Sequence, residues 1–168
     1  SIADSLAEIR AVADLTGHPQ RGEAIAASIL SAEERARLAA ARPQGMPSAV
    51  FYQRRGYTTG SDTLTAELMT LVGLTNAGGV LAGAGGAFVP LERLVAARPD
   101  YLVVETATAR ADDQGSALLA HPALARLYPT DRRIVLPARL TVCGGVSLAA
   151  AIDWLSREAE RVTGGRAP

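Results

Sequence analysis

The segment Arg54–Gly60, which reads Arg-Arg-Gly-Tyr-Thr-Thr-Gly, gathers the side chains best suited to hold a small molecule. The guanidinium groups of Arg54 and Arg55 can each bind a carboxylate or phosphate through two parallel hydrogen bonds, and they also stack on conjugated rings. Tyr57 adds an aromatic ring and a hydroxyl. A position directly after a short apolar run favours binding over a simple surface loop. We therefore expect a flexible loop that folds over a large, planar, anionic ligand.

Other residues carry weaker chemical signals. Gly83–Phe88 resembles a dinucleotide-binding fingerprint, but Phe88 occupies the third glycine position and no long strand precedes it. Cys143 lies beside two glycines just before an expected helix, where the helix dipole can stabilise a thiolate, yet no base neighbours it in sequence. Neither His18 nor His121 has a partner at metal-ligand spacing. We predict no catalytic residue, no metal ligand and no bound cofactor.

The candidate residues must be positioned by alternating strands and helices. Short apolar runs predict strands at Ser48–Gln53, Tyr101–Glu105 and Arg133–Leu136, with a very short one at Thr75–Ala77. The stretch Gly78–Ala87 has no periodicity and predicts a loop. Helices are expected near residues 2–13, 20–42, 62–72 with Asp62 as the cap, 91–97, one or two turns within 115–127, and 148–162.

Strands separated by helices pair in parallel, with helices on both faces of one sheet. The expected fold class is therefore α/β, a three-layer sandwich with a mainly parallel sheet, preceded by a helix. Ligands of such sheets bind outside the carboxyl ends of the strands. The segments to search are thus Gln53–Gly60, Gly78–Val89, Glu105–Asp113 and Pro137–Gly145, the last of which contains Arg139.

Composition narrows the class of partner. The 168 residues include 17 basic and 17 acidic side chains, so the formal net charge is zero. Without a basic run, the chain shows no electrostatic footprint for nucleic acid or for an anionic membrane surface. Hydrophobic residues make up 48% of the chain, as in an ordinary globular domain, and their runs are too short to cross a bilayer.

Three stretches together resemble a known family. Ala13–His18 is similar to the end of a linker helix that runs into leucine, threonine and glycine. Thr63–Asn76 is similar to a leucine-rich helix followed by glycine and asparagine, and Val89–Val104 matches a signature of leucine-glutamate, leucine and proline-aspartate before a strand. In this order they resemble the substrate-binding proteins of ABC importers for ferric siderophores, haem and cobalamin.

The resemblance implies a domain division and a set of partners. Residues 1–16 would be the end of the helix that links two lobes, and residues 17–168 would be the C-terminal α/β lobe of a periplasmic protein. An N-terminal lobe would complete the site, and a metal chelate would lie between the two lobes. An ABC permease in the inner membrane would receive that chelate.

The resemblance also implies roles for particular residues. In the family, aromatic and arginine side chains hold the ligand, which implies Arg54, Arg55, Tyr57 and Arg139 here. Glu92 matches the glutamate of the C-terminal lobe that meets arginines on the permease. A glutamate in the first turn of a helix also interacts favourably with the helix dipole, so local stabilisation stays open as its role.

Two other classes of function stay open on the sequence. One is a small α/β enzyme domain that uses Cys143 or the glycine-rich segment. The other is an interaction module that no longer binds a ligand. A first lobe encoded upstream would favour the importer, and a catalytic domain there would not.

Overall fold

The computed structural model describes residues 1–40, 45–105, 118–141 and 145–164. At its centre lies a four-stranded parallel sheet with the order β3-β1-β5-β6. Its strands are β1 (Ser48–Phe51), β3 (Thr75–Asn76), β5 (Tyr101–Glu105) and β6 (Arg133–Leu136). The three longer strands predicted from the sequence are thus parallel neighbours, as expected.

The middle residues of β1, β5 and β6 are apolar because both faces of the sheet are covered. Successive side chains of a strand point to opposite faces, so Phe51 and Val103 enter one hydrophobic cluster while Val50 and Leu102 enter the other. All four side chains are essentially inaccessible to solvent. The α/β three-layer class is confirmed.

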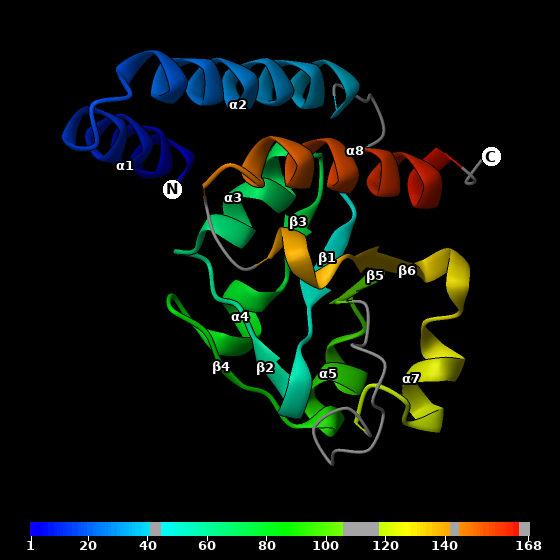
Figure 1. Ribbon diagram of the computed structural model, residues 1–168. Coiled ribbons are helices and arrows are strands. Elements are labelled where there is room, and N and C mark those ends of the chain that lie inside the picture. Colours follow the sequence, from blue (N-terminus) through cyan, green and yellow to red (C-terminus); the bar gives the residue numbers. More distant parts are fainter. Residues whose placement is uncertain (41–44, 106–117, 142–144, 165–168) are drawn as a thin grey trace.

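Helices form the two outer layers (Figure 1). One face of the sheet packs against α3 (Leu64–Leu71) and α8 (Leu148–Gly164), with α2 (Pro19–Ala40) lying over the outer side of α8 (Figure 1). The other face packs against α4 (Gly78–Ala82), α5 (Leu91–Ala97) and α7 (Pro122–Leu127). Helix α8 shows how spacing selects the buried face. Its buried side chains recur every three or four residues, which places them on one side of the helix, and they are Leu148, Ala151, Ile152, Leu155, Ala159 and Val162.

Helix α1 (Ile2–Leu15) lies along α2 and belongs partly to the same core. Ile2 and Leu6 enter the cluster on the α8 face of the sheet. The two helices approach closely because Gly22 has no side chain; a Cβ there would lie 2.4 Å from that of Ala13. The end of α1 leaves Leu15 88% exposed. Helix α1 is therefore anchored to the hydrophobic core at its first turns and presents apolar surface at its end.

One predicted helix cap and one predicted strand end are wrong. Thr63, not Asp62, caps α3, because its hydroxyl accepts from the backbone N–H of Ala66 at 3.2 Å. Strand β1 ends at Phe51, two residues early, because the N–H of Gln53 turns to the carbonyl of Tyr57 at 2.8 Å. That turn begins the candidate site.

Candidate functional site

The carboxyl ends of the parallel strands meet at one edge of the sheet. Beyond β1 lies η1 (Arg54–Gly56), beyond β6 lies η3 (Ala138–Leu140), and β5 ends at Glu105. Strand β5 separates β1 from β6, so the ends of these two strands are about 10 Å apart. Residues 106–117 and Cys143, which belong to the same predicted edge, lie outside the described residues.

The arginine turn, which we define as Arg54–Gly56, is fixed by its main chain. The N–H of Gly56 donates to the backbone carbonyl of Gln53 at 3.0 Å, and the Gly56 carbonyl accepts from the N–H of Val89 at 2.9 Å. Gly56 has a φ of +82°, and a Cβ there would lie 2.8 Å from both the Tyr52 hydroxyl and the Val89 carbonyl. Glycine is therefore required at this point, both for conformation and for space.

Both arginines of this turn have exposed side chains. Arg55 has a φ of 60°, in the left-handed region that non-glycine residues enter at a cost of about 1 kcal/mol. Such strain persists only where surrounding contacts impose it, and it concentrates at binding sites. The turn thus presents two guanidinium groups on a backbone that is already ordered.

The expectation of a flexible loop over Arg54–Gly60 is wrong. Tyr57–Thr58 forms β2, which pairs antiparallel with β4 (Ala87–Phe88). The pairing opposes Tyr57 to Phe88, whose rings lie 5.5 Å apart between centroids with planes inclined by 72°. The Tyr57 hydroxyl donates to the Gly85 carbonyl at 3.3 Å.

We call Tyr57 and Phe88 the aromatic pair. Phe88 is 68% exposed, a large apolar area for a side chain beside the arginine turn. The sequence reasoning did not nominate Phe88 as a binding residue. The sequence around Phe88 shows only a short apolar run after the glycines, and this run is too short to reveal the alternation of a strand.

The glycine-rich stretch is not the loop that its composition predicted. Gly78–Ala82 forms α4, and Ala87–Phe88 forms β4. A Cβ at Gly78 would lie 2.1 Å from the Thr59 carbonyl, and one at Gly60 would lie 2.1 Å from that of Ala84. These glycines let two backbones meet closely, so packing within the chain accounts for them.

Tyr52 connects the arginine turn to α5. Its side chain is buried, and its hydroxyl donates to the Val89 carbonyl at 2.9 Å. Burial raises the pKa of Tyr52, and the negative charge of Glu92 raises it further. The phenol therefore stays neutral and serves as a structural donor. Glu92 itself is exposed in the first turn of α5, where its carboxylate faces solvent.

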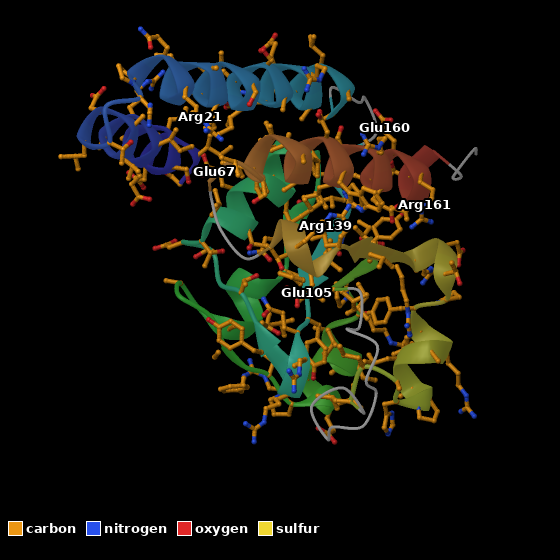
Figure 2. The ribbon with its side chains drawn as sticks, in the orientation of Figure 1. Arg21, Glu67, Glu105, Arg139, Glu160 and Arg161 are labelled. Carbon is orange, nitrogen blue, oxygen red and sulfur yellow. The ribbon has the colours of Figure 1, made fainter. Side chains whose placement is uncertain are left out.

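Arg139 lies at the far side of the edge, exposed within η3. Figure 2 shows Arg139 and Glu105 at the same end of the sheet. The Thr141 hydroxyl donates to the Glu105 carboxylate at 2.6 Å and so ties the end of β6 to that of β5. The structure thus places all four candidate ligand residues at the carboxyl edge, with Arg54, Arg55 and Tyr57 adjacent and Arg139 two strands away.

In the described part of the chain, this edge carries a hollow of about 180 Å³, lined by Phe51, Leu140 and Thr141 among others, which is too small to enclose a chelate. Two larger hollows among the described residues lie away from this edge, one of about 840 Å³ between α1, α2 and Gly145-Val146 and one of about 800 Å³ between α2 and α3. No cluster of three or more potential metal-ligating side chains is present among the described residues. In the same residues, no helix is both long and apolar enough to cross a membrane.

Comparisons with known proteins agree with this geometry. A family model described as "periplasmic binding protein" matches residues 2–139. The periplasmic haem-binding protein RhuT of Roseiflexus sp. RS-1, in its apo form, is 27% identical over 95% of this chain and 64% of its own, with a TM-score of 0.73. A periplasmic haem-binding protein of Pseudomonas aeruginosa is 26% identical over 93% of this chain and 59% of its own, with a TM-score of 0.71.

A third similarity concerns the fold alone. An ABC-type Fe³⁺-hydroxamate transport system from Saccharomonospora viridis DSM 43017 is 18% identical over 94% of this chain and 56% of its own, with a TM-score of 0.75. No curated protein sequence matches the chain. The chain therefore spans less than two thirds of the length of these three solved structures.

Proposed function

Because this chain belongs to the periplasmic binding protein family, we propose that it forms the C-terminal lobe of a substrate-binding protein that delivers a metal chelate to an ABC importer in the inner membrane. The observation that carries the proposal is the arginine turn, which holds two exposed guanidinium groups beside an aromatic pair at the carboxyl edge of the sheet. The protein works in the periplasm, and binding, not catalysis, is its activity. The family and the similar structures are binding proteins, so they favour this proposal over an enzyme that uses Cys143.

The ligand is a chelate of the haem, ferric siderophore or cobalamin class, and haem is the first to test. Two similar structures above 25% identity are described as haem-binding proteins. Haem is a planar ring with two carboxylates, which suits guanidinium forks and aromatic faces. In this arrangement Arg54 and Arg55 pair with the carboxylates, Tyr57 contacts the ring, and Arg139 closes the far side.

The carboxyl edge of the sheet does not enclose a ligand by itself, so a second surface must complete the binding site. The ligand lies between this lobe and an N-terminal lobe, and residues 1–16 end the helix that links them. Leu15 is 88% exposed, and the hollow of about 840 Å³ lies beside the same end of α1. Both features support the proposal that another part of the whole protein covers this helix end. Residues 17–168 then form the C-terminal lobe.

Glu92 docks the permease in this proposal. Its carboxylate is exposed in the first turn of α5 and so belongs to another element than the arginine turn. An exposed salt bridge adds only about 0–1 kcal/mol, so its contribution is to the register and rate of docking.

The test is titration of the full-length protein with haem, cobalamin and a ferric hydroxamate. Arg54→Ala combined with Tyr57→Ala should weaken binding of the cognate chelate by about 1–3 kcal/mol, since a charge-assisted bond and an aromatic contact are lost. Arg126→Ala, an exposed arginine on α7, is the matched control and should bind as the unaltered protein does. Failure of the unaltered protein to bind any of the three would refute the chelate class.

A further inference from the structure

Among the described residues, β6 is an edge of the sheet, since its one partner strand there is β5. An edge strand exposes a row of backbone N–H and C=O groups that can pair with a strand of another molecule. The opposite edge, β3, is only two residues long and offers little to pair with. Strand β6 has four residues, Arg-Ile-Val-Leu, of a composition that favours strands.

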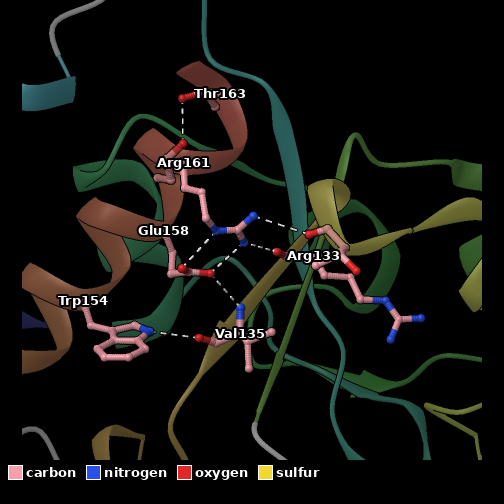
Figure 3. A network of polar contacts seen from close by, with 8 residues as sticks. Arg133, Val135, Trp154, Glu158, Arg161 and Thr163 are labelled. Carbon is pink, nitrogen blue, oxygen red and sulfur yellow. Dashed lines mark hydrogen bonds and ion pairs between the residues drawn. The ribbon is translucent and has the colours of Figure 1, made fainter. Parts of the chain in front are cut away.

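Both outward backbone groups of Val135 are bonded to side chains of α8 (Figure 3). Along a strand, the N–H and C=O of alternate residues point to the same side, so Arg133 and Val135 face away together. The Val135 N–H donates to the Glu158 carboxylate at 3.3 Å. The Val135 carbonyl accepts from the indole N–H of Trp154 at 2.9 Å.

The outward groups of Arg133 are satisfied in the same manner. Its N–H donates to the Thr130 carbonyl in the preceding turn. Its carbonyl accepts from the Arg161 guanidinium at 2.6 Å, and Arg161 in turn donates to Glu158 at 2.8 Å. All four outward-pointing groups of β6 thus have partners within this chain.

The three side chains from α8 form a single row. Trp154, Glu158 and Arg161 are spaced by four and three residues, so they lie on one face of the helix. Trp154 and Arg161 donate to backbone carbonyls of β6, and Glu158 accepts from a backbone N–H. A neighbouring strand would offer β6 the same alternation of donors and acceptors. We call them the edge cap.

We propose that the edge cap prevents β6 from pairing with β6 of a second copy of this chain. Packing of α8 on the sheet does not require these bonds, because the apolar side of α8 already supplies the contact. A strand of a second copy is the partner that the uncovered edge would fit, since identical short strands pair well through their main chains. The inference is independent of the ligand and of the proposed function.

The experiment compares three variants of the full-length protein by light scattering at increasing concentration. Trp154→Phe/Glu158→Ala/Arg161→Ala removes the edge cap and should double the particle mass relative to the unaltered protein as concentration rises. Arg21→Ala/Glu34→Ala removes the same charges from exposed positions of α2 and should leave the mass unchanged. Glu158→Gln keeps an acceptor oxygen for Val135 and should also leave it unchanged.

Hydrogen exchange supplies a second measurement that needs only one substitution. In Glu158→Ala the Val135 amide loses its acceptor and should exchange about tenfold faster, while amides of β5 keep their rates. A folded triple variant with the particle mass of the unaltered protein would overturn the proposal. If the triple variant does not fold, Trp154→Phe/Glu158→Ala replaces it, and an unchanged Val135 exchange rate in Glu158→Ala then overturns the proposal by itself.

Discussion

At the scale of single residues, Gly56 controls the shape of the arginine turn. Gly56→Ala should lower the free energy of unfolding by about 2–3 kcal/mol, because a side chain at a φ of +82° is strained and its Cβ meets the Tyr52 hydroxyl and the Val89 carbonyl. Gly17→Ala is the matched control, since Gly17 has a φ of +74° with open space around a Cβ. Urea denaturation measures both. Equal losses in the two variants would mean that the contact with Tyr52 and Val89 is unimportant.

Phe88 is the residue whose role follows from the structure and not from the sequence. Phe88→Leu should weaken haem binding about fivefold, because the aromatic face is lost while apolar area stays. Binding of a non-planar ferric hydroxamate should be unaffected. Val80→Ala, at another exposed apolar position, serves as the control for surface changes. Isothermal titration measures the affinity of the unaltered protein and of both variants for each ligand. An equal loss of affinity for haem and for the hydroxamate in Phe88→Leu would exclude a role for the ring plane.

At the scale of elements, the network that joins α8 to β6 depends on pH. The pKa of Glu158 lies below its ordinary value of 4.5, mainly because Arg161 donates to the carboxylate, with burial opposing and the Val135 N–H assisting. A lowered pKa stabilises the fold above pH 4.5, and this contribution is lost as the pH falls through the lower value. The difference in unfolding free energy between the unaltered protein and Glu158→Gln should therefore shrink below pH 4.5.

Urea titrations between neutral and acidic pH measure this difference. In an Arg161→Ala background the pH dependence should disappear, because the main cause of the lowered pKa is then absent. A pH-dependent difference that survives in that background would assign the effect to the Val135 N–H.

Elements with a strong period were predictable, and those held by distant contacts were not. Tyr101–Glu105 and Leu91–Ala97 have the predicted bounds because a doubly buried strand and a helix between prolines leave clear local patterns. The β2–β4 pair was missed because each strand has two residues and their partner lies about thirty positions away. Helix α4 was missed because glycine disfavours helices, and close backbone contact overrides that preference here.

The candidate site, like the helices and strands, was predictable in part. Arg54, Arg55, Tyr57 and Arg139 lie at the predicted edge because the order of strands and helices fixes where carboxyl ends meet. Their ligand contacts and the docking role of Glu92 stay predictions. The ordered turn was not predictable, since it depends on bonds from Val89 and Tyr52 that local sequence does not encode.

At the scale of the whole molecule, the proposed function assigns half of the ligand contacts to another lobe. Calorimetry of this lobe alone against haem, cobalamin and a ferric hydroxamate should show no submicromolar binding, because one open wall cannot enclose a ligand. The full-length protein is the positive control. A tight complex with the lobe alone would mean that the site is complete within this chain.

Docking and ligand binding should separate by mutation. Glu92→Ala in the full-length protein should reduce uptake of the chelate and leave its affinity unchanged, because Glu92 contacts the permease and not the ligand in the proposal. Glu34→Ala, an exposed glutamate on α2, is the control for loss of one charge. Paired uptake assays and titrations measure both properties. Loss of ligand binding in a folded Glu92→Ala protein would disprove the docking role.

The anchoring of the arginine turn has an evolutionary consequence. Its conformation is set by main-chain bonds, by Gly56 and by the buried hydroxyl of Tyr52. Selection for a new cargo can therefore act on the exposed side chains around it while the core that folds the lobe stays constant. If the proposed function holds, a lineage that carries this domain can move between chelates by a few surface substitutions, with no compensating change in the sheet beneath.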